Sequence, residues 1–219
     1  MKILFIGNSY TQNNNMPFIF KELAESKGHS VDVTVIARGG ETFEGHYYSR
    51  ETLGAISDGQ WDLAVLQEQS TRPVEDPDKM IRSATRLHNK IGNIRTILYL
   101  TWARQYAPEM QSLISESYFD LAKLLDAQIA PVGLVWQEFL KNEKQIELFT
   151  DDGHHPTLLA SYAIACTFYA TVFNESPMGL TNQFTHSSGI TYLIDKKVAE
   201  FIQYTVSGCC QSFAKQTWA

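Results

Sequence analysis

The feature that constrains the fold most is a regular alternation of short β-rich runs with longer segments of helical periodicity. The predicted strands are 2–6, 31–37, 61–67, 95–101 and 128–132. The predicted helices are 16–27, 43–57, 77–91, 109–127, 134–142, 157–173 and 190–211. This order is typical of parallel strands joined by helical crossovers. Because no repeat or linker divides the series, we predict a single α/β domain over residues 1–219 with a doubly wound parallel sheet of five strands.

Charge and hydropathy argue against two classes of partner. The formal net charge is −6 and no basic block is present, so we expect no nucleic-acid partner. No stretch approaches the ~20 apolar residues of a membrane span, so we expect no membrane partner. The first apolar run stops at Gly7-Asn8, which favours a strand over a secretion signal. The 3 cysteines fit neither a disulfide framework nor a zinc motif, and we expect a reducing, cytoplasmic location.

The loops that follow parallel strands lie along one edge of such a sheet, and ligands bind there. The first of these loops contains Gly7-Asn8-Ser9-Tyr10-Thr11. A serine beside a glycine that permits a sharp turn can present its hydroxyl upward from the sheet, so Ser9 is a candidate nucleophile. Two alternatives remain open for this loop, namely a locally capped turn and a phosphate-binding loop.

A second candidate segment is Asp151-Asp152-Gly153-His154-His155-Pro156. A histidine that acts as the base for a serine needs a carboxylate on its far ring nitrogen, and Asp152 can supply one to His155. Pro156 favours an extended backbone at His155 and so fixes the direction of its side chain, whereas His154 is predicted to point to the rim. The alternatives are capping of the following helix by the acids and a metal site formed by the two histidines and two aspartates.

Two further loops could supply hydrogen-bond donors to a negatively charged oxygen. Gly39-Gly40 follows the second strand, where a backbone N–H can approach a ligand without obstruction by a Cβ atom. Gln67-Glu68-Gln69-Ser70 follows the third strand and offers a side-chain amide. Each pattern is also common in ordinary solvated loops.

Together these four segments resemble the SGNH (GDSL-like) serine hydrolases, which have a flavodoxin-like, three-layer α/β/α fold. The resemblance spans the chain from Ile3 to Pro156. It implies that Ser9 is the nucleophile, that Gly40 contributes to the oxyanion hole, and that Asp152 and His155 complete a catalytic triad. In that family the catalytic histidine precedes a proline or a similar residue, as His155 does here.

The third block departs from the family pattern of Gly-x-Asn-Asp. Gln69 stands at the asparagine position, so the resemblance implies a similar amide donor on a longer side chain. Gln67 replaces the glycine, and we expect it either to narrow the pocket or to move the loop. The departure indicates an outlying branch of the family.

The resemblance implies acyl transfer, with an oxyanion held by the N–H groups of Ser9 and Gly40 and by the Gln69 amide. It requires neither a metal nor an organic cofactor, and the expected substrates are short-chain esters, including O-acetyl groups of carbohydrates. The residues predicted to shape the substrate pocket are Tyr10, Arg38, Arg72, Trp102 and Arg104. Packing is the alternative for the two aromatic residues, and surface salt bridges are the alternative for the arginines.

Two other functions remain open at this point. One is a flavodoxin-like module that binds a phosphate or nucleotide through residues 8–11. The other is a degenerate hydrolase fold that binds carbohydrate, which is favoured if Gln67 fills the site. His29, His46, His88 and His186 lie in no motif, and we interpret them as surface or structural residues.

Overall fold

The protein is built around a parallel sheet of five strands in a computed structural model that describes residues 1–141, 146–185 and 189–217. The strands are β1 (Lys2–Gly7), β2 (Asp32–Ala37), β3 (Leu63–Leu66), β4 (Arg95–Tyr99) and β5 (Gln128–Ala130). Their order is β2-β1-β3-β4-β5, and every neighbouring pair is parallel. This is the flavodoxin-like order, and it confirms the predicted doubly wound α/β fold.

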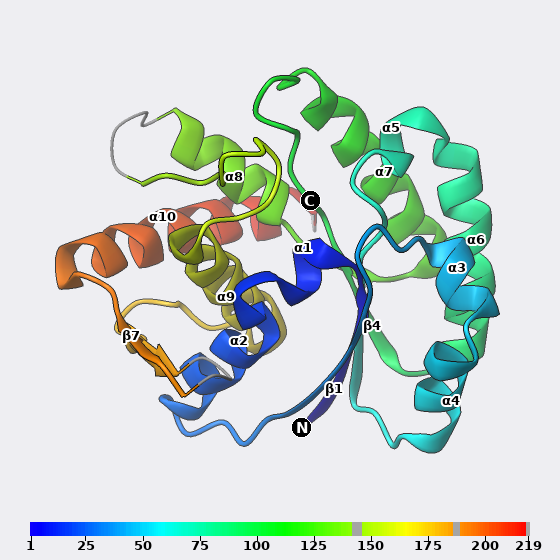
Figure 1. Cartoon of the computed structure of the whole chain (residues 1–219), viewed down its shortest axis with the longest axis horizontal. Helices are drawn as coiled ribbons and strands as arrows, with labels where there is room; N and C mark the ends of the chain where they lie inside the picture. Colours follow the sequence, from blue (N-terminus) through cyan, green and yellow to red (C-terminus); the bar gives the residue numbers. More distant parts are fainter. Residues whose placement is uncertain (142–145, 186–188, 218–219) are drawn as a thin grey trace.

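Helices cover both faces of the sheet (Figure 1). One face carries α2 (Met16–Glu25), α8 (Val132–Leu140), α9 (Leu158–Phe173) and α10 (Lys196–Thr217). The other face carries α3 (Phe43–Tyr48), α4 (Arg50–Asp58), α6 (Pro77–Ile91) and α7 (Met110–Leu125). The result is a three-layer α/β/α arrangement.

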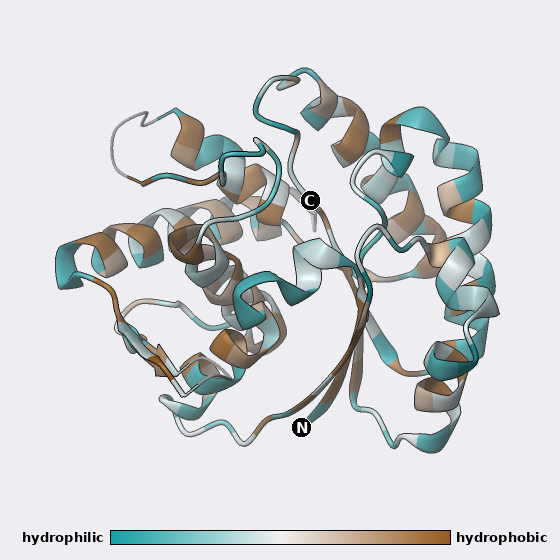
Figure 2. Cartoon of the chain, viewed as in Figure 1, coloured by the Kyte–Doolittle hydropathy of each residue, from teal (hydrophilic) through white to brown (hydrophobic). Residues whose placement is uncertain are grey.

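The alternation of side chains along β1 explains why the core has two halves. Ile3 and Phe5 are buried among residues of the first helical layer, and Leu4 and Ile6 are buried among residues of the second. The run from Ile3 to Ile6 is apolar at every position, which suits a strand in a sheet buried on both faces. Figure 2 accordingly shows hydrophobic strands at the centre and hydrophilic residues on outward parts of the helices.

The structure corrects the predicted helix 43–57, which is two helices. Ser49 has extended backbone angles, and its side chain accepts a hydrogen bond from the Thr52 N–H as the N-cap of α4. A serine therefore ends one helix and begins the next, because its hydroxyl replaces a missing backbone partner. The predicted helix 134–142 begins earlier, at Val132, and its last residue, Asn142, lies outside the described residues.

The predicted helix 190–211 is also corrected. Its first residues form β7 (Thr191–Leu193), which pairs antiparallel with β6 (Gln183–Thr185), and the helix α10 starts only at Lys196. Asp195 caps this helix, since its side chain accepts hydrogen bonds from the N–H groups of Lys197 and Val198. Within the described residues, no helix is both long and apolar enough to cross a membrane.

Short helical turns follow the carboxyl ends of two central strands. They are α1 (Ser9–Gln12), which continues into the 3-10 turn η1 (Asn13–Asn15), and α5 (Arg72–Glu75). In Figure 1, α1 lies at the end of β1 away from the N-terminus. The order of strands changes direction between β1 and β3, which makes this edge the expected ligand-binding edge.

Candidate active site

Ser9 is the first residue of α1 and follows β1 directly through Gly7 and Asn8. The side chain of Asn8 accepts a hydrogen bond from the Tyr10 N–H (3.1 Å), and its carbonyl oxygen accepts from Thr11 N (3.0 Å). These bonds close a tight turn at the end of a buried strand. Ser9 is partly exposed at that turn, so its hydroxyl is accessible.

Gln67 supports this turn from below. Its side chain is fully buried, and Oε1 accepts hydrogen bonds from Asn8 N and from the Thr11 hydroxyl, both at 2.9 Å. A Cβ atom on Gly7 would lie 2.7 Å from Gln67 Oε1 and 2.3 Å from Thr11 Oγ1, so glycine is needed there. The degenerate-hydrolase hypothesis is favoured if Gln67 fills the site above Ser9. The Gln67 side chain instead lies beneath the turn, where it hydrogen-bonds Asn8 and Thr11.

His155 joins Ser9 to Asp152. The Ser9 hydroxyl and His155 Nε2 are 2.8 Å apart, and His155 Nδ1 lies 2.6 Å from Asp152 Oδ2. A carboxylate only accepts hydrogen bonds, so Nδ1 carries the proton and Nε2 is left to accept from the Ser9 hydroxyl. Both are hydrogen-bond distances, as expected between a nucleophile and its base and between that base and an orienting carboxylate.

A compact turn over residues 150–156 sets the geometry of the Asp152–His155 pair. Asp152 Oδ1 accepts hydrogen bonds from the backbone N–H groups of His154 and His155, both at 2.9 Å. Gly153 sits between them with φ of +71°, a conformation that favours glycine. His154 Nε2 lies 3.7 Å from Asp152 Oδ2, whereas His155 Nδ1 lies 2.6 Å from the same oxygen. The hydrogen-bonded acid and histidine are therefore Asp152 and His155, the second of the two possible pairs.

The hydrogen bonds around Asp152 favour its charged form. Desolvation acts against the carboxylate, but donors from the His155 backbone and ring, the His154 backbone and the Thr150 hydroxyl outweigh it and lower the pKa of Asp152 below its usual range. Asp152 is thus ionised, and accepts hydrogen bonds, over the pH range in which most enzymes work. That is the state needed to orient His155.

Three side chains of this turn are also close enough together to be compared with a metal site. Asp152, His154 and His155 each offer a ligand atom, and these atoms lie within 4.8 Å of one another. However, both ring nitrogens of His155 already have hydrogen-bond partners, Ser9 and Asp152. A metal ion bound to His155 would have to displace Ser9 or Asp152 from the ring. The geometry therefore favours the hydrogen-bonded series Ser9–His155–Asp152 over a metal site.

The predicted oxyanion donors lie on two loops whose Glu41 and Glu68 carbonyl oxygens contact the side chain of Asn8, the residue before Ser9. Gly40 is exposed with φ of +71°, and within the described part of the chain its N–H has no acceptor. Gln69 Oε1 accepts from Thr71 N and Arg72 N, both at 2.9 Å, at the start of α5. Its Nε2, the atom that the donor role needs, donates to no other described residue. The role of both residues stays a prediction.

The aromatic residues predicted to line the substrate pocket are buried. Tyr10 and Trp102 are 2% and 0% exposed, and their rings stack with centroids 4.5 Å apart. Trp136 stacks on the far side of Trp102 at 4.0 Å. The structure therefore favours packing over a pocket role for Tyr10 and Trp102. The three stacked rings of Tyr10, Trp102 and Trp136 support the turn that carries Ser9.

The three predicted arginines differ in their surroundings. Arg72 lies 3.8 Å from Asp76, which is the salt bridge expected as the alternative. Arg104 follows β4 near Tyr10: burial raises the pKa of Tyr10 to about 12, and the positive charge of Arg104 acts in the opposite direction. Arg38 lines a cavity, described next, whose lining residues do not include Ser9. A substrate contact stays a prediction for Arg38 and Arg104.

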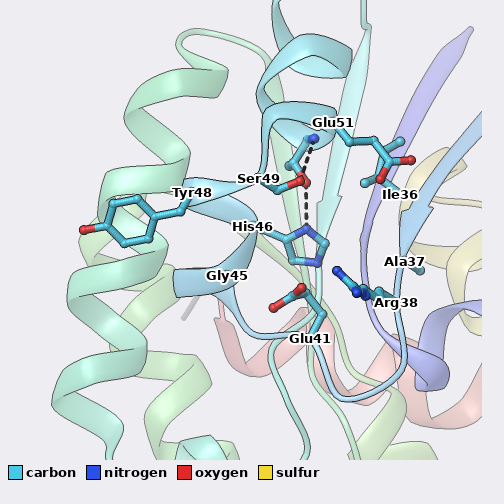
Figure 3. A pocket seen from close by; sticks show the side chains of 10 residues that line it. Ile36, Ala37, Arg38, Glu41, Gly45, His46, Tyr48, Ser49 and Glu51 are labelled. Atoms are coloured by element: carbon cyan, nitrogen blue, oxygen red, sulfur yellow. Dashed lines mark hydrogen bonds between the residues drawn. The ribbon is translucent and has the colours of Figure 1, made fainter.

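That cavity, of about 230 Å³, lies between the end of β2 and helices α3 and α4. Figure 3 shows the His46 ring in its wall, near Arg38 and Glu41. His46 Nε2 lies 2.8 Å from the Gly7 carbonyl oxygen, and Nδ1 lies 2.9 Å from the Thr52 hydroxyl. Burial lowers the pKa of His46, which favours a neutral ring that donates to Gly7 and accepts from Thr52.

His46 therefore fixes the end of β1 directly before the Ser9 turn. The burial of His46 and its two hydrogen bonds confirm the structural one of the two interpretations that the sequence offers, surface or structural, but no motif around His46 predicts the contact with Gly7. The only signal was a histidine in a helix that follows the Gly-Gly loop.

Comparison with known proteins adds evidence from structure. No family model matches the sequence, and no curated protein matches it. A structure from Slackia heliotrinireducens assigned to the SGNH hydrolases aligns with a TM-score of 0.68 and 27% identity, over 78% of this chain and 98% of that chain. The fold is that of the SGNH hydrolases.

Two further structures share this SGNH fold. A DUF4886 family protein from Bacteroides uniformis aligns with a TM-score of 0.71 and 19% identity, over 95% of this chain and 93% of that one. An acetyl-xylooligosaccharide esterase from Geobacillus aligns with a TM-score of 0.64 and 14% identity, over 78% of this chain and 93% of that one. At these identities the two structures support the shared fold alone, and the resemblance to a hydrolase rests on the Slackia structure.

Proposed function

We propose that this protein is a serine esterase that hydrolyses short-chain carboxylic esters, with O-acetyl groups of carbohydrates as the favoured substrate class. The observation that supports this most strongly is the 2.8 Å separation between Ser9 Oγ and His155 Nε2 in a chain that also includes Asp152. The esterase of acetylated oligosaccharides among the structural neighbours supports the substrate class.

In the proposed mechanism, His155 Nε2 takes the proton of the Ser9 hydroxyl as Ser9 Oγ attacks the ester carbonyl carbon. The carbonyl oxygen becomes negatively charged and accepts hydrogen bonds from Ser9 N, Gly40 N and Gln69 Nε2. His155 then gives its proton to the leaving alcohol. A water molecule, deprotonated by His155, then attacks the acyl carbonyl carbon. As the bond between Ser9 Oγ and the acyl carbon breaks, His155 returns the proton to Ser9 Oγ and the carboxylic acid leaves. Asp152 stabilises the charged imidazole throughout.

The arrangement of backbone donors argues against the phosphate-binding alternative. The N–H groups of Asn8, Tyr10, Thr11 and Gln12 already donate to Gln67 or to Asn8. A phosphate cradle needs such N–H groups to be free. The loop after β1 instead presents a hydroxyl next to a base.

The test combines covalent labelling with turnover. A fluorophosphonate probe should label the wild-type protein at Ser9, and p-nitrophenyl acetate should be hydrolysed faster than esters of longer acids. Ser9→Ala should lose both labelling and turnover with its melting temperature nearly unchanged, since the hydroxyl is not packed in the core. Equal turnover by Ser9→Ala and wild type would refute the nucleophile assignment.

A further inference from the structure

A buried acid lies at the end of β3 beside the proposed active site. Glu68 is 1% exposed, and among the described residues it forms no ion pair. Burying a carboxyl group without a cation partner costs folding free energy, which its hydrogen bonds must offset. A residue retained at such a cost is a candidate for a functional role.

The Glu68 carboxyl group joins two loops. Its Oε1 accepts hydrogen bonds from Phe43 N at 3.0 Å and from Gln69 N at 2.7 Å. Phe43 begins α3, three residues after Gly40, and Gln69 is the predicted side-chain donor. One oxygen atom therefore ties together the two loops that carry proposed oxyanion donors.

The backbone of Glu68 extends this connection to the serine turn. Asn8 Nδ2 donates to the Glu41 carbonyl oxygen at 3.0 Å and lies 3.5 Å from the Glu68 carbonyl oxygen. The Glu68 N–H donates to the Tyr118 hydroxyl on α7 at 3.2 Å. Residues of three loops and one helix thus meet at Glu68.

We propose that Glu68 is a positioning residue for the oxyanion hole: its carboxyl group holds the Gly40 loop and Gln69 in place beside Ser9, and its charge state acts on the developing oxyanion. This inference rests on the proposed esterase function. Glu68 does not touch the reacting atoms in this scheme. It acts through the two loops.

The charge state matters because a carboxylate near the hole would oppose a second negative charge. Burial raises the pKa of Glu68 to about 7, even though the N–H groups of Gln69 and Phe43 and the charge of Arg72 act in the opposite direction. Glu41 adds a like charge, and Tyr118 faces Glu68 from α7. In either charge state Oε1 can accept both N–H groups, so ionisation of Glu68 leaves the two loops joined and changes only the charge beside the hole. Because that charge opposes the oxyanion, activity should fall as Glu68 ionises above about pH 7.

Three variants of the full chain test this. Glu68→Gln keeps an oxygen that can accept both N–H groups and removes the charge. Glu68→Ala removes the acceptor. Glu44→Gln is the matched control, because Glu44 is a partly exposed acid on α3 that pairs with Lys79 at 2.7 Å. The measurements are kcat and KM on p-nitrophenyl acetate across about pH 5.5 to 9.5, the rate of fluorophosphonate labelling, and the melting temperature.

We expect Glu68→Ala to lower kcat by ~10- to 10²-fold with a smaller change in KM, somewhat less than the loss of a whole oxyanion donor. Glu68→Gln should keep kcat within ~3-fold at low pH and lose the decline in activity above about pH 7. Glu44→Gln should follow the wild-type profile.

The proposal is overturned if Glu68→Ala keeps wild-type kcat, or if the pH profiles of Glu68→Gln and wild type coincide. If Glu68→Ala does not fold, the Glu68→Gln profile decides. A wild-type protein that is neither labelled nor active would instead refute the esterase function itself, and this inference with it. Labelled, active wild type with unresponsive Glu68 variants refutes only the role of Glu68.

Discussion

The indole of Trp102 donates a hydrogen bond from Nε1 to the carbonyl oxygen of His154, at 3.0 Å. Trp102 also stacks on Tyr10, the residue after Ser9. One side chain therefore contacts both the nucleophile turn and the loop of the proposed base, which are 146 residues apart at Ser9 and His155. We therefore expect the distance between Ser9 Oγ and His155 Nε2 to depend on this bridge.

Replacing Trp102 by Phe should separate its two contacts. The smaller ring can still stack on Tyr10, but the donor to His154 is lost, at a cost of about 1 kcal/mol in unfolding free energy. We expect kcat on p-nitrophenyl acetate to fall ~10-fold with little change in KM, because a small displacement of His155 weakens proton transfer. Steady-state kinetics and thermal unfolding measure both effects, and unchanged kcat would show that the bridge is dispensable.

The pairing of acids and histidines gives a second prediction. His155→Ala should lower kcat by ~10⁴-fold or more, and Asp152→Asn by a comparable order. His154→Ala and Asp151→Asn, the neighbours that make no such hydrogen bonds, should each lower kcat by less than ~10-fold. The four kcat values measured side by side test the assignment, and the reverse ranking would place the catalytic pair one residue earlier.

Gln69 offers a test of the oxyanion hole. Gln69→Ala should lower kcat by ~10- to 10³-fold with a smaller effect on KM. Because Oε1 also accepts hydrogen bonds at the start of α5, Gln69→Glu is the matched variant: it keeps the acceptor and removes the Nε2 donor. A Gln69→Glu variant as active as wild type would remove this amide from the hole.

Chelation distinguishes the hydrogen-bonded triad from a metal site. Turnover should survive prolonged incubation with EDTA, because the proposed base and its orienting carboxylate are protein groups. The control is the same treatment followed by added zinc. Activity that is lost on chelation and restored by zinc would favour Asp152, His154 and His155 as metal ligands.

Glu68 also predicts how stability depends on pH. Its pKa is raised to about 7 in the folded protein, so the folded state binds the proton more tightly than the unfolded chain does. Its contribution is therefore most favourable at acidic pH and weakens as the pH rises from the ordinary carboxyl range to about 7. Urea unfolding of wild type and Glu68→Gln should show a free-energy difference that moves in favour of the variant over this range. A difference independent of pH would contradict the buried-acid interpretation.

The sequence predicts the sheet well because the strands are buried on both faces and apolar at nearly every position, as in Ile3 to Ile6. It predicts Asp152 and His155 as partners because Pro156 and Gly153 act locally. It misses the break at Ser49, where a capping hydroxyl interrupts an otherwise helical pattern. It also misses the β6–β7 hairpin, whose 3-residue strands are too short to show alternation.

The contacts that support the site could not be predicted for a different reason. Gln67 meets Asn8 across 59 positions of sequence, and His46 meets Gly7 across 39. Such contacts depend on which strands become neighbours. Glu68 appears in the sequence as one polar loop residue among several, and only burial distinguishes it.

The contact of Gln67 with Gly7 and Thr11 has a consequence for engineering and for evolutionary drift. The space beneath the serine turn is shared, because the missing Cβ of Gly7 leaves room for Gln67 Oε1, which in turn accepts from Thr11 and Asn8. Transplanting a Gly-x-Asn-Asp block into this chain would leave Asn8 N and the Thr11 hydroxyl without their acceptor. Substitutions at positions 7, 11 and 67 should therefore be strongly non-additive, and a change of the third block is expected to succeed only when the first block changes with it.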